Sequence, residues 1–398
     1  MVDTPPYRRD RITVFLLATT GMHRAVFHAM GAVIPAMRKD LGISATVANV
    51  HVSALAIGMM LMGLFAERIA RRTGRGNAIW IGMIGIVSGL VLLALAQSVK
   101  LTLPIMFLLI GGVGSLVIGL TPAALSDHQS SHRAVALAES SVVSGILGCI
   151  VPAAVGLSQA LGFGWGGAAL FPVVMLAMLA LRFHGVSVPE AAPVVDIGGE
   201  TRPAKLDRRF WAFFVTLVFT DSFEFGLIFG AVMLLEARGM TEATAGFALS
   251  LLFWGMLIGR IVGSRLVRRH PPFRMLQITF GLAMAGTLVH WLSPVLVFSV
   301  IGLFLAGLGI SNLYPLTTSL GLQAAGAASS EGGSRLGMAT GISMLMSPLL
   351  FGILTDAASI QVAYAVEPIF LLAAILISTV GGRWLLSRDR PTREAFAL

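Results

Sequence analysis

Charged residues are scarce in this chain of 398 residues. Asp, Glu, Lys and Arg make up 12% of it, against 56% hydrophobic residues, whereas about a quarter of an ordinary soluble domain is charged. The chain therefore has too little polar surface to be a soluble protein. Cysteine is limited to Cys149, which lies in an apolar run, so an intramolecular disulfide framework is excluded.

Motifs for several kinds of chemistry are also missing. The sequence has no Gly-Lys-Ser or Gly-Lys-Thr loop for ATP, no Cys and His cluster with metal-ligand spacing, and no nucleophile motif in its loops. We therefore expect neither an enzyme nor an ATP-driven pump, and no cofactor or metal. The net charge of +9 would suit nucleic acid in a soluble protein. Here the basic residues lie in loops between apolar runs, so no nucleic-acid partner is expected.

Apolar runs recur along the whole chain. Each is roughly 20 residues long, enough to cross a hydrocarbon core of about 30 Å as a helix. The runs are continuous rather than alternating, which favours helices over membrane strands. The sequence predicts an all-α integral membrane protein with twelve transmembrane helices, at 11–36, 46–70, 77–97, 101–125, 134–160, 166–183, 208–236, 242–267, 273–292, 295–322, 333–356 and 362–386.

One extended polar segment divides the chain between the sixth and seventh spans. It carries several Pro and Gly residues, which are typical of a linker. We predict an N-terminal six-helix bundle at 1–184, a cytoplasmic linker at 185–207 and a C-terminal six-helix bundle at 208–398.

The Lys and Arg residues predict the orientation. With a cytoplasmic N-terminus, 22 of the 28 fall on the cytoplasmic side and four outside, while Arg24 and Arg260 fall within spans. Both termini are therefore expected in the cytoplasm. We expect a plasma membrane, of the bacterial inner-membrane type, and no obligate protein partner.

The two halves repeat one another. A shift of 197 residues lays 42–72 on 239–269 without a gap, and matches Gly58 with Gly255. A shift of 196 lays Pro152 on Pro348, each with Gly seven residues before and four after. Parallel six-helix repeats place a solute site at their interface near the midplane, where alternating access operates.

The loop after the second span carries a motif. Residues 63–72 read GLFAERIARR. This resembles the cytoplasmic loop motif of the major facilitator superfamily, although Ala70 stands where that pattern has a second Gly. The second half keeps three of the basic residues, Arg265, Arg268 and Arg269. The resemblance covers essentially the whole chain and implies a secondary transporter, without naming the solute.

By this resemblance the loop is a conformational latch. Gly63 would let two helix backbones approach, and Glu67 would pair with basic groups across the bundle when the inward gate is shut. The alternative is a basic loop that only anchors the topology. The other latch residues are Arg68, Arg71, Arg72 and Arg265.

Pro152 and Pro348 predict bends in the fifth and eleventh helices. Part of the pattern around them resembles the fifth-helix motif of the proton-coupled drug antiporters. The fourth span lacks the Arg that those antiporters usually carry there, which argues against drug efflux.

Ionisable residues at bilayer depth are costly, so each suggests a function. In the first span Thr20, Arg24 and His28 follow at four-residue spacing and form one stripe. In the seventh span Asp221 and Glu224 lie on adjoining faces. The repeat places Arg24 opposite Asp221, so a guanidinium is expected to meet two carboxylates at a solute and proton site.

Arg24 cannot lose its charge, whereas a carboxyl group can exchange a proton. We therefore expect one acid to pair with Arg24 and the other to titrate, with Glu224 favoured as the proton site and Asp221 as its partner in coupling. The alternative is a static buried ion pair that fixes helix register, with the solute bound elsewhere.

Other polar positions complete the expected site. Tyr314 in the tenth span and Trp254 in the eighth would stack on the solute, and Asn312 would add one hydrogen-bonding group; the alternative for the two aromatic residues is packing between helices. Glu139 and Arg335 occupy equivalent positions in the fifth and eleventh spans and would form a cytoplasmic gate. The alternative for this pair is an exposed interfacial charge.

The leading hypothesis is proton-coupled symport of a small organic solute, an anionic metabolite drawn by Arg24. Its partners are the solute, protons and the lipid bilayer. One alternative is an efflux antiporter of lipophilic cations or drugs, favoured by the two acids and a Met-rich lining. A more remote alternative is a solute sensor that does not transport.

Overall fold

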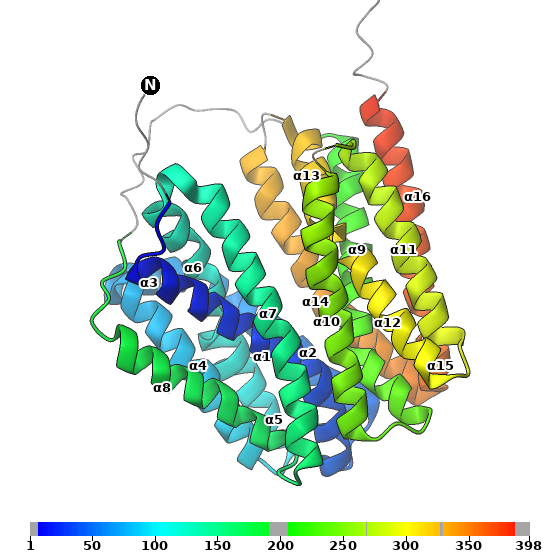
Figure 1. The fold of residues 1–398 in the computed structure, drawn as a ribbon, viewed down its shortest axis with the longest axis horizontal. Coiled ribbons are helices and arrows are strands. Elements are labelled where there is room, and N and C mark those ends of the chain that lie inside the picture. The colour runs from blue at the N-terminus through cyan, green and yellow to red at the C-terminus, as the bar shows by residue number, and fades with distance from the viewer. Residues whose placement is uncertain (1–6, 191–205, 268, 327–328, 387–398) are drawn as a thin grey trace, which may run out of the picture.

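The computed structural model describes residues 7–190, 206–267, 269–326 and 329–386, and every regular element in these ranges is a helix. The helices form two bundles that lean together at one end and diverge at the end where α1 begins and α16 ends (Figure 1). The prediction of an all-helical membrane protein is confirmed. Most of the predicted linker, 191–205, lies outside the described residues.

Eight α-helices and three short η-helices make up the first bundle. The fourth predicted span consists of α5, η1 and α6 in succession, and the sixth of η3 and α8. The bounds are α1 Arg11–Leu41, α2 Ala45–Gly63, α3 Ala66–Thr73, α4 Arg75–Leu95, α5 Val99–Pro104, η1 Ile105–Val113, α6 Ser115–His128, η2 Ser130–His132, α7 Arg133–Ala160, η3 Trp165–Ala169 and α8 Leu170–Phe183.

The second bundle repeats this order with fewer interruptions. The tenth predicted span consists of α12 and α13, and the twelfth of α15 and α16. The bounds are α9 Arg208–Ala237, α10 Glu242–Leu266, α11 Pro272–Leu292, α12 Leu296–Ile310, α13 Leu313–Ala325, α14 Ser329–Ala357, α15 Ile360–Ala363 and α16 Val366–Leu386.

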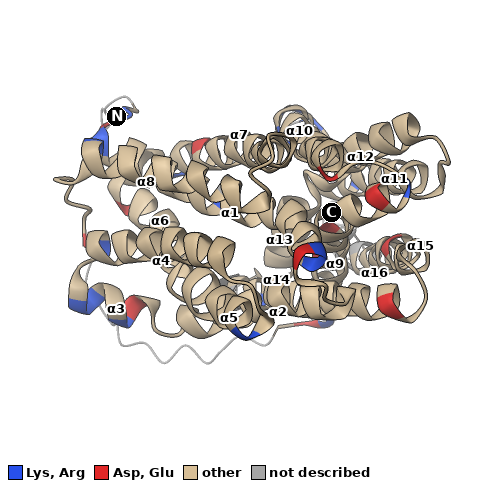
Figure 2. Cartoon of the chain, turned by 90° about the horizontal axis from the view of Figure 1, so that it is seen from below, with Lys and Arg blue, Asp and Glu red and all other residues tan. Residues whose placement is uncertain are grey.

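Eleven helical segments of the described chain are long and apolar enough to cross a membrane. The exception among the twelve predicted spans is α1, which is 31 residues long, about 46 Å at the usual helical rise. Its length suffices, but its polar and charged residues lower its hydropathy. Figure 2 shows how few charged segments interrupt the remaining helices. The least apolar span is therefore one of those that line the cavity described below.

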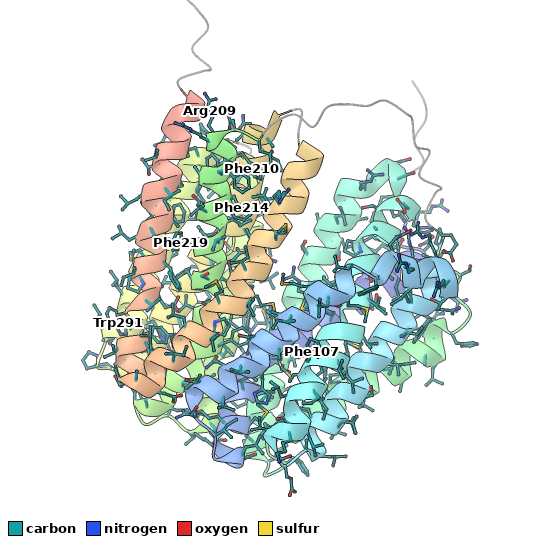
Figure 3. All side chains as sticks on the ribbon, turned by 180° about the vertical axis from the view of Figure 1, so that it is seen from behind. Phe107, Arg209, Phe210, Phe214, Phe219 and Trp291 are labelled. Atoms are coloured by element: carbon teal, nitrogen blue, oxygen red, sulfur yellow. The ribbon has the colours of Figure 1, made fainter. Side chains whose placement is uncertain are left out.

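Local signals set the helix starts. The Asp10 carboxylate accepts a hydrogen bond from the Thr13 N–H at 2.8 Å and caps α1, and Asp207 caps α9 through the N–H groups of Arg209 and Phe210. Both are the side chains expected at an N-cap. Beyond its cap, α9 carries Phe210, Phe214 and Phe219 along the second bundle (Figure 3).

The glycines that match in the repeat lie where two helix backbones are in close contact. A Cβ on Gly58 in α2 would lie 2.1 Å from the Phe107 carbonyl oxygen (labelled residue in Figure 3). A Cβ on Gly255 in α10 would lie 2.3 Å from the Phe304 carbonyl oxygen. The two contacts are equivalent in the repeat, and small residues are what membrane helices use where their backbones touch.

The fourth and tenth spans are interrupted, whereas the sequence predicted unbroken helices. In the fourth, η1 is a π-helix, and the Gly114 N–H donates to the Leu109 carbonyl at 2.8 Å. In the tenth, α12 ends at Ile310 and α13 begins after Asn312, whose side-chain amide donates to the Gly259 carbonyl at 2.9 Å. Contacts with a neighbouring helix accompany the second break, so span hydropathy alone did not reveal it.

Candidate functional site

A cavity of about 200 Å³ lies between the two bundles. Its walls come from α1, α6 and α7 of the first bundle and from α10 of the second. Its polar side chains are Thr20, Arg24, His28, Ser140, Ser141, Ser144 and Arg260.

A larger vestibule of about 620 Å³ adjoins this cavity and shares Ser141 and Arg260 with it. Its lining extends to Arg265 and Pro272, at the end of α10 and the start of α11. These residues belong to the end where the bundles diverge (Figure 1), which we call the cytoplasmic end, following the predicted orientation. The cavity is therefore open toward that end.

The predicted stripe of α1 lies together on the cavity wall. Thr20, Arg24 and His28 all line it, and Arg24 is exposed to the open space. No ion pair of the described residues includes Arg24 within 4.0 Å. The expected direct pairing with Asp221 or Glu224, and the alternative of a static buried ion pair, are therefore wrong for this conformation. The bundles diverge here and hold the groups apart.

Asp221 and Glu224 occupy different environments on α9. Asp221 is 3% exposed, and its Oδ2 accepts a hydrogen bond from the Thr340 hydroxyl at 2.5 Å. Its Oδ1 has no hydrogen-bond partner within the described chain. Glu224 is half-buried, within electrostatic reach of Arg260 and Arg24. One acid is thus buried against a hydroxyl, while the other is half-buried and forms no ion pair among the described residues.

Sequence reasoning missed Arg260 as a site residue. It was recognised inside a span, but the repeat aligned it with Gly63 of the loop motif. In the structure it lies in the cavity wall of α10, and its Nε donates to the Ser311 carbonyl at 3.3 Å. The sequence did carry a signal for this role, because Arg260 is an isolated charged residue in an otherwise apolar run, four residues before Ser264.

His28 connects three helices at the cavity. Its ring stacks on Phe253 of α10 at 4.1 Å between centroids and 11° between planes. It also lies against α7, where a Cβ on Gly148 would come within 2.2 Å of its Nδ1. Pro152 has no N–H, so the Gly148 carbonyl lacks its usual partner within α7. The proline expected to bend the helix thus stands one turn from the His28 contact.

Of the site residues predicted in the eighth and tenth spans, two lie at or beside the cavity and one lies away from it. Tyr314 is 41% exposed and within electrostatic reach of Asp221 and Arg24, so it lies beside the site. Asn312 lines the vestibule, but its amide is engaged at the helix break. The prediction that Trp254 contacts the solute is wrong in this structure. It shares an exposed face of α10 with Phe247, Leu251 and Ile258, which is typical of a lipid-facing stripe.

Glu139 is bound within its own bundle. It forms an ion pair with Arg9 and accepts a hydrogen bond from the Tyr7 hydroxyl at 2.5 Å. Burial and this carboxylate raise the pKa of Tyr7 to about 12, so the phenol keeps its proton. Arg335 is exposed at the cytoplasmic end of α14. In this conformation Glu139 therefore holds the N-terminal segment, and the predicted gate stays a prediction.

The residues of the loop motif that were assigned to the latch are exposed in this conformation, while Ala66 and Ala70 pack inward. Among the described residues nothing lies within 4 Å of a Cβ placed on Gly63, so the close helix approach expected for the shut gate stays a prediction. Glu67 is exposed at the start of α3. The arginines of the motif, Arg68, Arg71 and Arg72, are exposed too, as is Arg265.

The opposite, extracellular end is closed by polar contacts between the bundles. Lys39 of α1 forms ion pairs with Glu236 at 3.0 Å and Glu242 at 2.9 Å, and Gln159 of α7 donates to Glu242 at 3.0 Å. Asp356, near the end of α14, accepts hydrogen bonds from the backbone N–H groups that begin α2, at Ala45 and Thr46. Together with the vestibule, these contacts describe an inward-open conformation.

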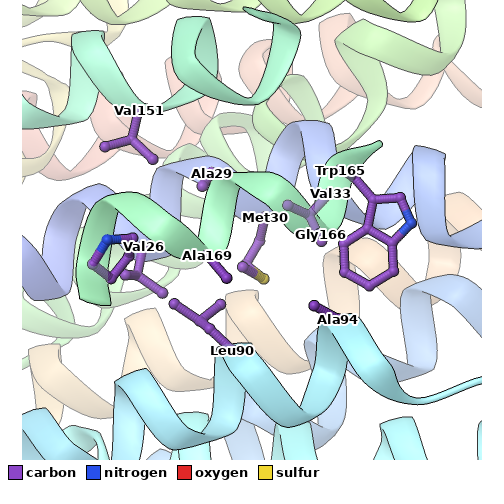
Figure 4. Close-up of a pocket in the computed structure, with 11 residues that line it drawn as sticks. Val26, Ala29, Met30, Val33, Leu90, Ala94, Val151, Trp165, Gly166 and Ala169 are labelled. Carbon is purple, nitrogen blue, oxygen red and sulfur yellow. The ribbon is translucent and has the colours of Figure 1, made fainter. Parts of the chain in front are cut away.

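A second, smaller pocket lies inside the first bundle and is a poor solute site. It has a volume of about 20 Å³, no more than a water molecule requires. Val26, Met30 and Leu90 point into it, with Trp165 at its side (Figure 4). The central cavity is the better candidate because it alone of the two combines charge, hydroxyl groups and access.

Comparison with known proteins agrees with this architecture. The chain is 27% identical over 307 residues to an uncharacterized MFS-type transporter of Burkholderia pseudomallei (strain 1106a), covering 74% of this chain and 72% of that protein. It is 22% identical over 289 residues to the chloramphenicol resistance protein CraA of Acinetobacter baumannii, covering 69% of each.

Solved structures share the fold. The nucleoside transporter NupG superposes with a TM-score of 0.74 at 12% identity, over 94% of this chain and 99% of that one. A POT family transporter in complex with 5-aminolevulinic acid gives 0.74 at 14% identity, over 93% and 96%. The family model described as Major Facilitator Superfamily matches residues 15–334. With this match over most of its length, the chain belongs to the major facilitator superfamily, as a multi-pass membrane transporter and not an enzyme.

Proposed function

We propose that this transporter carries a small organic anion across the plasma membrane together with protons. The observation that supports this most is the pair Arg24 and Arg260. They come from opposite bundles, line the same cavity, and neither has a carboxylate within 4.0 Å among the described ion pairs. Two such guanidinium groups are suited to bind a carboxylate or another planar anion.

The charge balance of the site supports symport. With Arg24 alone, two ionised acids would leave the cavity negative, which opposes an anion. Arg260 makes the number of arginines equal to that of acids. Protonation of Asp221 or Glu224 then leaves one net positive charge for the solute, so proton and anion binding favour each other.

We assign the exchanging proton to Asp221, whereas the sequence favoured Glu224. Asp221 is buried and has one hydroxyl donor, from Thr340. Burial without a cation favours the neutral form of a carboxyl group. Glu224 lies three residues further along α9, is half-buried and has no ion pair among the described residues, so we treat it as the second acid of the site.

Export of drugs is the second candidate. The relative named chloramphenicol resistance protein supports it, as does the partly apolar vestibule. In that case Asp221 and Glu224 would attract a cationic solute, and Arg24 and Arg260 would keep the acids in position.

A thermal-shift screen of the purified protein in detergent tests the two candidates. Organic anions and lipophilic cations are compared at a mildly acidic and a mildly basic pH, in wild type, Arg24→Gln and Arg260→Gln. Arg274→Gln, at an exposed position outside the cavity, is the matched control. Stabilisation by anions that is stronger in acid and lost in both cavity variants would support symport. Stabilisation by cations that survives Arg260→Gln would replace it with export.

A further inference from the structure

A buried carboxyl group outside the cavity has no function in the scheme above. Glu367, in the first turn of α16, is 1% exposed. Its Oε2 has no hydrogen-bond partner, and no ion pair of the described chain includes it. An ionised carboxylate in this position would be costly at membrane depth. In the inward-open conformation we therefore take Glu367 to hold a proton.

The packing of α9 is shaped around this carboxyl group. A Cβ on Gly226 would lie 1.8 Å from Oε1 of Glu367, so only glycine leaves room for it. Gly226 stands five residues after Asp221 and two after Glu224 on the same helix. These helical positions point away from Gly226, so Glu367 approaches α9 from a different side than the cavity. Any movement of α9 therefore changes the surroundings of both sites.

A chain of polar groups leads from the extracellular end toward Glu367. At that end, Arg238 donates to the Ser299 hydroxyl at 3.0 Å and to the His290 carbonyl at 2.7 Å. The His290 ring contacts Ser299 through Nδ1 and the Tyr364 hydroxyl through Nε2, at 3.3 Å. Tyr364 stands three residues before Glu367, whose Oε2 has no hydrogen-bond partner among the described residues and is free to accept a proton. Arg238 is half-buried, and the next three groups are fully buried.

The first bundle shows that the fold does not require these groups. A shift of 197 residues lays α4 on α11 end to end and places Leu93 on His290. A shift of 196 lays the start of α8 on the start of α16 and places Phe171 on Glu367. These two equivalent positions are apolar, whereas Ser299 has the polar equivalent Thr102, so His290 and Glu367 are the members of the polar chain that are specific to the second bundle.

We propose that Glu367 is a second proton-binding site, which exchanges protons with the extracellular side through His290 and Tyr364. A proton arriving at the His290 ring passes through the Tyr364 hydroxyl to the Glu367 carboxylate. The titratable groups on this side of Glu367 are Tyr364, three residues before it, and His290 on α11, which contacts Tyr364; Arg238 contacts Ser299 beyond them, and Asp221 and Glu224 lie on other faces of α9. When α9 moves and opens Glu367 to these polar groups, the proton passes back through Tyr364 and His290 to the extracellular side. This inference does not depend on which solute the cavity takes.

Infrared difference spectroscopy between acidic and basic pH, without solute, tests the proposal on the full chain in detergent. We expect a carboxylic-acid C=O band that appears in acid and disappears in Glu367→Gln. Tyr364→Phe should keep this band but slow its shift on transfer to heavy water. A band unchanged in Glu367→Gln would overturn the proposal.

Asp221→Asn distinguishes this site from the proposed function. A band lost in Asp221→Asn and retained in Glu367→Gln would place the exchanging proton in the cavity alone, and would overturn the second site. A band lost only in Glu367→Gln would support the second site and count against Asp221 as the coupling acid. If Glu367→Gln does not fold, Glu367→Asp replaces it: a shifted band supports the proposal, and an unshifted band overturns it.

Discussion

Two guanidinium groups face a cavity of about 200 Å³ from opposite bundles. At the scale of single residues, this changes the chemistry expected of the site. Arg24 alone offsets the charge of one of the two acids, whereas Arg24 and Arg260 together offset both. The same scale separates Asp221 from Glu224. Asp221 is buried and contacts a hydroxyl group, whereas Glu224 is half-buried, although they are three residues apart.

Thr340→Val should destabilise the protein. It leaves Asp221 without its hydroxyl donor, and an unsatisfied buried polar group costs about 1–3 kcal/mol. We expect a lower melting temperature in detergent, while Thr340→Ser, which keeps the hydroxyl, stays near wild type. Equal melting temperatures for the two variants would mean that the hydrogen bond to Asp221 does not contribute to stability.

At the scale of helices, glycine positions distinguish packing from gating. Gly58 touches the backbone of the fourth span, whereas Gly63 has open space around it in this conformation. The two residues lie on the same helix and differ by little more than one turn. Their substitutions therefore report on different states of the transporter.

Gly58→Ala should prevent normal packing of α2, because overpacking costs about 1–3 kcal/mol and the obstructing atom is a backbone oxygen. Gly63→Ala should fold normally and still reduce transport, if the loop closes against another helix in the outward-open state. The measurements are the yield of monodisperse protein and uptake into proteoliposomes. Normal transport by Gly63→Ala would contradict the latch.

The cap of α1 predicts a pH dependence. Burial raises the pKa of the Asp10 carboxyl, but hydrogen bonds from Thr13 and His128 outweigh this effect, so the pKa lies below its ordinary value. The stabilisation is therefore present above the ordinary carboxyl pKa and is lost as the pH falls through the lowered one. Asp10→Ala should cost about 1 kcal/mol at neutral pH.

The check is the melting temperature of wild type and Asp10→Ala in detergent over a pH series. The difference between them should shrink as the solution becomes acidic. A difference that stays constant into acid would show that the carboxylate does not stabilise the helix start.

At the scale of the whole molecule, the two bundles are held together at one end and separated at the other. The holding contacts join α1 and α7 to α9 and α10, and α2 to α14. Several of them involve charges near the extracellular surface. We expect these contacts to break when the transporter opens outward, since the cavity cannot reach that side while they persist.

Lys39→Gln combined with Asp356→Asn should shift the protein toward the outward-open state. The probe is Ser144→Cys, in the cavity wall, with Cys149→Ser as background. A membrane-impermeant thiol reagent applied from outside should label the probe faster in the double variant than in its absence. Lys100→Gln, a charge change on the same side, is the control. An unchanged labelling rate would show that these contacts do not limit opening.

The sequence by itself was sufficient for the membrane class, the helix count, the repeat and the family. These follow from run lengths, hydropathy and residue identities that are local or periodic along the chain. It also singled out the stripe of α1 and the two acids of α9, because charges are rare enough in spans to be noticed individually.

Only the tertiary structure decided which of these groups meet. Arg260 lines the cavity, Trp254 does not, and Arg24 forms no ion pair within the described residues, because each outcome depends on how helices from two bundles rotate and separate. Glu367 was overlooked since its significance lies in what surrounds it, a glycine on α9 and no counter-ion. Hydropathy records the cost of burying a side chain in the membrane, whereas packing determines the partners that offset it.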